Sequence, residues 1–265
     1  MKLSIIIPAW NAKAFLKDCV ESLERSEIND KEIIIIDNGS TDESIEEIEE
    51  NYPNVKFIRN KTNLGVSPAW NQGIRIASGE YILLLDADTV ILQKALEELA
   101  DYMDRHPEVG LSGAMLRYPN GDLQYSALRF PTLKQKMARL FPDYGWSKKI
   151  LDEGEYRNWT YDQYKEVDYL LGACHFVRRK ALDQVGLLDE RIYYGPHDCD
   201  YCLRMYQAGW KVVYNPKAII IHRHNRLGRK KIKMFLWHFK CLAIYFLKHG
   251  YLFSYNYNRG RLKHI

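Results

Sequence analysis

The stretch YILLLDADTVI, residues 81–91, joins an apolar run to a pair of carboxylates and decides how the chain is interpreted. Residues 81–85 are short, apolar and free of glycine and proline, as in a strand that is buried on both faces. Asp86 and Asp88 follow at once. Two like charges beside an apolar core are costly unless a cation or hydrogen bonds offset them. The stretch therefore predicts a buried strand that ends at a functional edge.

Similar apolar runs precede it, and amphipathic segments separate them. The runs are LSIII (3–7), EIIII (32–36) and VKFI (55–58), and the segments are 13–25, 43–50, 67–77 and 93–105. This alternation predicts an α/β chain, in the order βαβα, with a parallel sheet. Further strands are expected at 109–116, 167–177, 211–214 and 218–222, after a loop-rich, aromatic-rich stretch from 118 to 164.

Composition sets the class of protein. The chain has 265 residues, 46% of them apolar, which is enough to bury a large core. Its five cysteines are an odd set at irregular spacing, so we expect free thiols. Lys2 is followed directly by a strand-like run, so we expect no signal peptide and a cytoplasmic protein. The net charge of +4 is uneven, since no acidic residue follows Asp200.

Polar residues follow each early strand, where ligands of open α/β sheets bind. Asp37 and Asn38 end the second run, and an acid there often accepts hydrogen bonds from a ribose. PAWN (8–11) replaces the glycine fingerprint of dinucleotide folds, which disfavours a nicotinamide enzyme. Ser40 and Glu43 match a helix capping box.

The two aspartates after the fourth run favour a hard divalent cation. Carboxylate oxygens suit Mg²⁺ or Mn²⁺, which are commonly held together with substrate phosphates. On extended backbone, Asp86 and Asp88 point to opposite sides, so one would face a ligand and the other would anchor the loop. The competing interpretation is that Asp88 caps the following helix and Asp86 is simply solvated.

Taken in order, six segments resemble glycosyltransferase family 2, the inverting enzymes of the GT-A fold, and are similar to bacterial rhamnosyltransferase-like enzymes of surface polysaccharides. They are SIIIPAWNA, IIIIDNGSTD, NLGVSPAWNQGI, YILLLDADTVI, LLGACHFVRRKALDQVGLLDERIYY and HDCDYCLRMYQAGWKVVYNPKAIIIH, and they span about residues 3–222. The resemblance implies a GT-A catalytic domain over 1–221, which is an α/β, Rossmann-like fold with a mixed, mainly parallel central sheet flanked by helices.

The resemblance also implies a donor site for a nucleotide diphosphate sugar. Asp37 and Asn38 would contact the base and ribose, and Asp86 and Asp88 would be the DxD pair, with Asp88 on the metal and His222 completing the metal site. The cation, Mg²⁺ or Mn²⁺, would bridge the diphosphate. The implied donor-binding positions are Pro8, Ala9, Asn11, Asp37, Asn38, Gly65, Asn71, Asp86, Ala87 and Asp88.

On the acceptor side, the resemblance implies that Asp198 is the catalytic base, with Gly172, Ala173 and His197 lining the acceptor and donor-sugar subsite. The acceptor would be a hydroxyl of a glycan or lipid-linked glycan. His197 stands where the family usually has Glu, and Trp70 where many members have Arg. The competing interpretation is that Asp198 caps the helix that follows it.

Other interpretations remain open. His197, Cys199 and Cys202 resemble part of a zinc or redox site, although no second cysteine pair completes a four-ligand set. A sugar nucleotidyltransferase would normally carry a glycine-rich basic loop after the first strand, which PAWNAKAF is not. A catalytically silent, sugar-nucleotide-binding scaffold would keep the same residues without turnover.

Residues 222–265 form a basic, aromatic tail that we expect to be helical. Its apolar run is interrupted by His238 and Lys240 before it reaches the length of a membrane span. It suits a helix that lies on an anionic membrane surface, on the inner face of the cell membrane. The alternative is a helix packed on the catalytic domain. No recognition motif accompanies the charge, so nucleic acid is not an expected partner.

Overall fold

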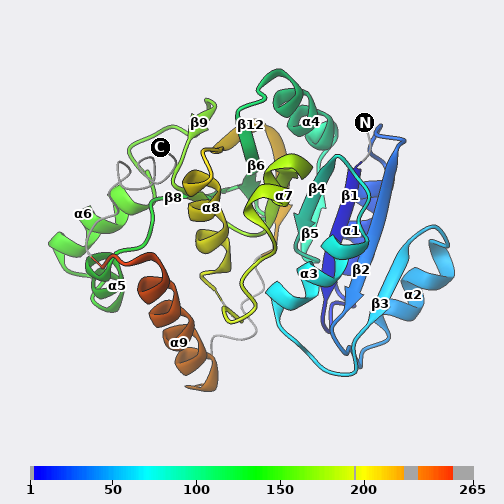
Figure 1. Ribbon diagram of the computed structural model, residues 1–265, viewed down its shortest axis with the longest axis horizontal. Coiled ribbons are helices and arrows are strands. Elements are labelled where there is room, and N and C mark those ends of the chain that lie inside the picture. The colour runs from blue at the N-terminus through cyan, green and yellow to red at the C-terminus, as the bar shows by residue number, and fades with distance from the viewer. Residues whose placement is uncertain (1–2, 194, 224–231, 253–265) are drawn as a thin grey trace.

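The computed structural model describes residues 3–193, 195–223 and 232–252, and Figure 1 labels its elements. One ten-stranded sheet runs through these ranges, in the order β3-β2-β1-β4-β11-β6-β12-β5, with β7 and β9 pairing β6 and β12 at its side. A two-stranded sheet of β8 and β10 lies apart from it. Strands far apart in sequence are therefore neighbours in the sheet, above all where β11 lies between β4 and β6.

The first half of the sheet is parallel and follows the expected alternation. Its strands are β1 (Leu3–Ala9), β2 (Lys31–Asp37), β3 (Lys56–Arg59) and β4 (Tyr81–Leu85), and its helices are α1 (Leu16–Glu24), α2 (Ser44–Asn51), α3 (Val66–Ile76) and α4 (Ala95–Arg105). The register pairs Ala9 with Asp37, so β1 and β2 end side by side. The residues after these strands therefore gather at one edge of the sheet.

The second half is mixed. It contains β5 (Thr89–Ile91), β6 (Val109–Arg117), β11 (Cys174–Arg178) and β12 (Lys211–His222), with α7 (Arg179–Val185) and α8 (His197–Gln207) between the last two strands. β11 is antiparallel to β4 and β6, whereas β12 is parallel to β6. The strands expected at 211–214 and 218–222 form one strand with a register shift between Asn215 and Ile219.

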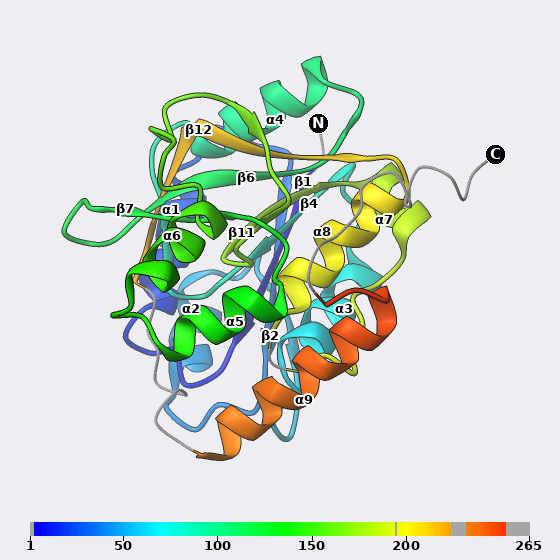
Figure 2. The ribbon, with the colours of Figure 1, turned by 90° about the vertical axis from the view of Figure 1, so that its left-hand side faces the viewer.

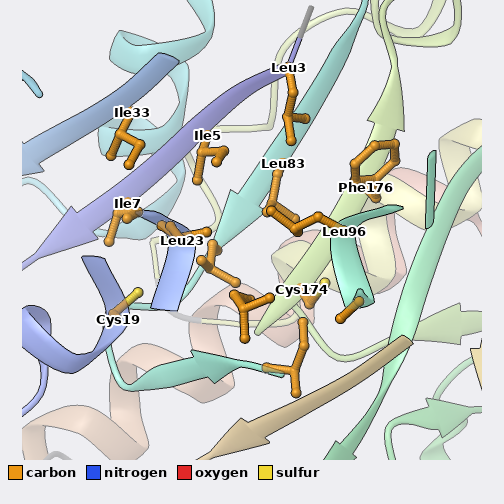
Figure 3. Close-up of a cluster of buried hydrophobic side chains, with 14 of the residues drawn as sticks. Leu3, Ile5, Ile7, Cys19, Leu23, Ile33, Leu83, Leu96, Cys174 and Phe176 are labelled. Atoms are coloured by element: carbon orange, nitrogen blue, oxygen red, sulfur yellow. The ribbon is translucent and has the colours of Figure 1, made fainter. Parts of the chain in front are cut away.

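Alternate side chains of the strands enter two apolar layers on opposite faces of the sheet. Ile5 and Ile7 of β1 pack with α1 and α4, and Figure 3 shows this layer from Leu3 to Phe176. Ile6 of β1 packs with α3, α8 and the last helix, α9 (Ile232–His249). Each fully buried isoleucine contributes about 1.5–3 kcal/mol. The sheet is covered on both faces, as its continuous apolar strands predict.

The stretch from 118 to 164 contains more regular structure than the expected loop. It forms β7 (Leu123–Gln124), β8 (Ala127–Leu128), α5 (Leu133–Leu140) and α6 (Gly145–Gly154), and β9 (Lys165–Glu166) follows it. Thr132 caps α5, since its side chain accepts from the backbone N–H of Gln135 and the Gln135 side chain reciprocates. The strand expected at 167–177 is split into β10 (Tyr169–Leu170) and β11.

The expected capping box at Ser40 and Glu43 is wrong. The α2 helix begins after Glu43, which has a left-handed backbone and makes no capping hydrogen bond. Asp42 Oδ1 instead accepts from the backbone N–H of Ser44 at 3.2 Å. Ser40 Oγ accepts from the backbone N–H of Asn11 at 3.1 Å, so this serine joins the loop after β1 to the loop after β2.

The tail begins with His222 at the end of β12, and α9 follows. Cys241, Leu242, Tyr245 and Phe246 of α9 are buried, and the last three belong to the layer that contains α8. No described helix is long and apolar enough to cross a membrane. The basic cluster at 224–231 and the last residues, 253–265, lie outside the described residues.

Candidate active site

The ends of β1 and β2 form a polar rim. Asp37 is 6% exposed, and its Oδ1 accepts from the backbone N–H of Ser40 at 2.8 Å. Asn11 has a φ of 49°, and its Oδ1 accepts from the backbone N–H of Thr41 at 2.9 Å. Pro8 and Ala9 are the last two residues of β1. The structure thus brings these predicted donor residues together at one edge.

Asn38 connects this rim to the start of α3. Its Nδ2 donates to the carbonyl oxygen of Gly65 at 3.1 Å, and its Oδ1 accepts from the backbone N–H of Leu64 at 3.3 Å. Gly65 has a φ of +93°, and an added Cβ would lie 2.5 Å from the ring of Tyr193. Only glycine fits this position without strain.

Asn71 has a different setting from the other predicted donor residues. It is buried on α3, its Nδ2 donates to the carbonyl oxygen of Leu188 and to Glu190, and its Oδ1 accepts from the backbone N–H of Leu188. Its amide therefore holds the segment after α7 against α3. A buried amide with all these bonds stabilises the packing of the site's wall.

Asp86 and Asp88 converge on His222 rather than pointing to opposite sides. His222 Nε2 lies 3.4 Å from Asp88 Oδ1 and 3.9 Å from Asp86 Oδ2. Ligand atoms of all three residues lie within 4.8 Å of one another. The turn between them is fixed, since Thr89 Oγ1 donates to the Asp86 carbonyl oxygen at 2.7 Å. Ala87 lies between the two acids.

Asp88 does not cap a helix, because β5 follows it directly and α4 begins only at Ala95. The competing structural interpretation of this aspartate is therefore wrong. The backbone of Asp88 is held by the residue that follows β12, since the backbone N–H of Arg223 donates to its carbonyl oxygen at 3.0 Å.

The two carboxylates of this triad repel each other. Burial raises the pKa of Asp86, and the nearby charges of Asp88 and Asp198 raise it further, although His222 opposes them. Burial lowers the pKa of His222, but its two carboxylate neighbours outweigh that effect and raise it. A divalent cation would offset the repulsion between the carboxylates.

Gln124 is a residue of the site that the sequence analysis missed. Its Oε1 lies 2.7 Å from Nδ1 of His222, and both side chains are buried. An amide oxygen accepts only, so Nδ1 donates to Gln124 and Nε2 is the ring nitrogen that faces the two carboxylates. A bound cation would take the place of a proton on Nε2. Gln124 lies on β7, and only the pairing of β7 with β6 brings it to the end of β12.

Asp198 lies in the first turn of α8 and borders Gly172. Its Oδ1 accepts from the backbone N–H of Cys199 at 2.8 Å, and Pro196 is the residue that precedes the helix. Asp198 is therefore not the N-cap residue. The backbone N–H of Asp86 donates to the carbonyl oxygen of Ala173 at 3.1 Å, which ties the triad to this segment.

His197 and Gly172 form the wall beside Asp198. The ring of His197 packs edge-on against Trp70, with centroids 5.3 Å apart. Its Nδ1 accepts from the backbone N–H of Gly195 at 3.2 Å, and burial lowers its pKa against the opposing charge of Asp198. A Cβ on Gly172 would lie 3.1 Å from His197 Nε2 and 3.5 Å from Asp198 Cβ.

The cysteines of α8 serve packing. Cys199 and Cys202 are fully buried, and Cys199 Sγ donates to the hydroxyl of Tyr245 at 3.1 Å. Burial raises the pKa of Cys202 well above that of an ordinary thiol, which disfavours the thiolate that zinc binding and redox chemistry need. In the part of the chain that the structure describes, the group suited to a metal is Asp86, Asp88 and His222.

Comparison with known proteins gives concordant results. The model of Glycosyl transferase family 2 matches residues 4–186. The N-acetylglucosaminyl-diphospho-decaprenol L-rhamnosyltransferase of Mycobacterium tuberculosis is 26% identical over 255 residues, which cover 92% of this chain and 83% of that protein.

Two solved structures share the fold. The crystal structure of S. aureus TarS 1–349 gives a TM-score of 0.65 at 17% identity and covers 98% of this chain and 68% of that one. A mannosyltransferase from Pyrobaculum calidifontis, in complex with GDP-Man and Mn²⁺, gives 0.64 at 17% identity and covers 93% of this chain and 63% of that one. The family match spans more than half of the sequence, and the chain therefore belongs to glycosyltransferase family 2, with a GT-A fold.

Proposed function

We propose that the protein transfers a sugar, with inversion, from a nucleotide diphosphate sugar to a hydroxyl of a glycan or lipid-linked glycan. The observation that carries the proposal is that Gly172 and Ala173 join the proposed base to the triad of Asp86, Asp88 and His222, since Gly172 borders Asp198 and the carbonyl oxygen of Ala173 accepts from Asp86 N–H. Inversion needs a base on one side of the sugar and stabilisation of the leaving diphosphate on the other.

The donor half consists of the rim and the triad. In the proposal, Asp37 and Asn38 bind the base and ribose, with Pro8, Ala9, Asn11 and Gly65 shaping the pocket and Asn71 supporting its wall. Asp37 is buried at the end of a parallel strand, where open α/β sheets bind nucleotides.

The triad fits Mg²⁺ or Mn²⁺. Two carboxylates and one imidazole converge within 4.8 Å, the carboxylates repel each other, and Gln124 holds the ring of His222 with Nε2 toward them. Asp88 and His222 would be ligands, with Asp86 beside them. A bound cation would neutralise the charge that grows on the departing diphosphate. The related mannosyltransferase fold was solved with GDP-Man and Mn²⁺, which agrees with this assignment.

The acceptor half rests on Asp198. Its carboxylate would take the proton from the attacking hydroxyl as the new glycosidic bond forms and the bond to the diphosphate breaks. The backbone N–H of Cys199 fixes the direction of the carboxylate. Gly172, Ala173 and His197 would contact the acceptor and the donor sugar, and the missing Cβ of Gly172 lets His197 and Trp70 pack beside Asp198.

The name of the mycobacterial relative supports the choice of acceptor and sugar. That protein is an L-rhamnosyltransferase whose acceptor is N-acetylglucosaminyl-diphospho-decaprenol, a lipid-linked sugar. We propose the same class of acceptor here, a deoxyhexosyl or hexosyl donor, and a role in cell-surface polysaccharide synthesis. The enzyme would then work at the cytoplasmic face of the membrane.

The test uses two aspartate variants and a panel of nucleotides. Thermal shift with UDP, GDP, dTDP and CDP, each with and without Mn²⁺, should show metal-dependent stabilisation by one of them. Asp88→Asn should lose that stabilisation, whereas Asp198→Asn should keep it. Both should abolish sugar transfer. If Asp198→Asn still transfers sugar, the assignment of the base is wrong, and if no nucleotide binds with metal, a silent scaffold becomes the better interpretation.

A further inference from the structure

The hairpin of α5 and α6 exposes large apolar side chains that the catalytic site does not use. They follow a helical stripe along α5 and continue into the turn and the first residues of α6: Leu133, Met137, Leu140, Phe141, Tyr144 and Trp146, with exposed fractions from 39% to 61%. Soluble proteins usually scatter such side chains singly over their surface. A stripe of this kind marks an interaction surface.

The outer side of α9 extends this surface. Phe239 and Leu247 are 66% and 84% exposed, whereas Tyr245 on the opposite side of the helix is buried. The backbone N–H of Leu133 donates to the carbonyl oxygen of Leu252 at 2.7 Å, so the start of α5 meets the end of α9. Figure 2 shows α5, α6 and α9 on the side of the molecule that faces the viewer. We call the hairpin stripe and the outer side of α9 the membrane face.

Basic side chains accompany the apolar ones. Lys134, Arg139, Lys148 and Lys149 are exposed on the hairpin, and its acids are Asp143 in the turn and Asp152 and Glu153 at the end of α6. The sequence of α9 contains no acid. Apolar side chains set among lysines and arginines suit a bilayer with anionic headgroups. A second copy of the chain would bring like charge against like charge, so self-association fits this face less well.

The inner side of the hairpin leads toward the proposed base. Lys136 and Arg139 of α5 line a cavity together with Tyr169 of β10, and β10 packs against α8, the helix that carries Asp198. Cys199 follows Asp198 directly and bonds to Tyr245 of α9. The membrane face and the acceptor side of the site are therefore built on the same elements.

We propose that the membrane face docks on an anionic bilayer, so that a lipid-linked acceptor reaches Asp198 from the side of the hairpin. The evidence for docking is the set of exposed residues itself, whereas the role of the lipid-linked acceptor rests on the proposed function. Because no described helix can cross a membrane, the attachment is interfacial, with apolar side chains at the level of the acyl chains and lysines at the headgroups.

The experiment is flotation of the full chain with vesicles of phosphatidylcholine alone or with phosphatidylglycerol added. The triple variant Leu140→Gln, Phe141→Gln, Trp146→Gln removes the tip of the stripe, and Lys148→Glu with Lys149→Glu reverses its charge. Ile76→Gln is the matched control, since Ile76 is 47% exposed but lies on α3. Unchanged melting temperatures establish that the variants fold.

We expect the wild type and Ile76→Gln to float with the anionic vesicles and much less with the neutral ones. Each hairpin variant should bind roughly tenfold more weakly, and high salt should release the wild type. The proposal is overturned if the wild type does not float, if the hairpin variants float as well as the wild type, or if they abolish a dimer without changing flotation. Nucleotide binding with Mn²⁺, measured without vesicles, distinguishes failure of this docking from failure of the proposed transfer.

Discussion

Gln124 Oε1 lies 2.7 Å from His222 Nδ1, although 98 residues separate the two side chains. The bond fixes the imidazole tautomer and points Nε2 at Asp86 and Asp88. Hydrogen bonds of this kind to metal-ligating histidines orient the ring and strengthen the ligand. Gln124 therefore belongs to the proposed metal site although it donates no ligand atom.

Replacement of Gln124 should weaken metal binding. Gln124→Leu removes the acceptor for Nδ1–H, so we expect the affinity for Mn²⁺, titrated in the presence of the bound nucleotide, to fall about 10- to 100-fold. Gln124→Glu keeps an acceptor and should restore most of the affinity. The control is Gln184→Leu, which removes a different glutamine, one whose Oε1 accepts a hydrogen bond from Trp210 Nε1. Wild-type affinity in Gln124→Leu would exclude a role for this bond.

Gly172→Ala should slow transfer without weakening donor binding. The added Cβ would lie 3.1 Å from His197 Nε2 and 3.3 Å from the ring of Trp70, so the wall beside Asp198 must shift. Small displacements of positioned groups reduce rates strongly, and we expect at least about a tenfold lower kcat. Gly145→Ala is the control, because nothing lies within 4 Å of its added Cβ. Equal kcat in the two variants would show that the wall tolerates the methyl group.

The parallel half of the fold could be predicted from the sequence because its signals are local. Apolar runs such as 32–36 and 81–85 are too short for helices and are bounded by polar loops, and the structure confirms each of them as a strand. The α5–α6 hairpin was not predicted. Its stripe of apolar residues alternates with lysines in a stretch rich in aromatic residues, which was interpreted as a loop.

Local sequence patterns gave wrong predictions at positions where tertiary contacts determine the structure. Ser40 and Glu43 have capping-box spacing, but Ser40 is drawn to the backbone of Asn11, and Glu43 adopts a left-handed backbone. The sequence indicated Asp86 and Asp88 as a pair, but the strand period placed them on opposite sides. They converge because β4 ends at Leu85 and the chain turns before β5. Gln124 had no local signal, since only strand pairing brings it to His222.

Glu32 should stabilise the fold in a pH-dependent way. Its side chain is 11% exposed and accepts from Ser4 Oγ, Ser78 N–H and Lys56 Nζ. Burial raises the pKa of Glu32, but these hydrogen bonds outweigh it and lower the pKa to about 2. Because the unfolded pKa is about 4.3, the contribution is complete above that pH and is lost as the pH falls toward 2.

The variant Glu32→Gln should therefore lower the free energy of unfolding by about 2 kcal/mol at pH 7. The difference from the wild type should shrink between pH 4.5 and 2, as measured by urea unfolding across this range. Glu50→Gln on the exposed side of α2 serves as the control and should change stability little at any pH. A difference that stays constant down to pH 2 would contradict the assigned pKa.

Breaking the contact between α8 and α9 at Asp200 should lower the free energy of unfolding strongly. Asp200 is buried, and its oxygens contact His249 Nε2 at 2.8 Å, Lys248 Nζ at 2.7 Å and Arg204 Nε at 3.0 Å. Burial raises the pKa of Asp200, but its cationic and hydrogen-bonding partners outweigh that effect and lower it. A charged group in this position stabilises the fold only while its partners remain.

Asp200→Leu should thus lower the free energy of unfolding by about 3–5 kcal/mol, because it leaves the cations of both helices without their carboxylate in a buried site. The matched control is Glu108→Leu, which breaks the half-exposed pair with Lys211 and should cost at most about 1 kcal/mol. Urea unfolding of both variants gives the comparison. If the two losses are equal, the charges around Asp200 contribute no more than a surface ion pair, and the buried side chains of α9 are what hold it against α8.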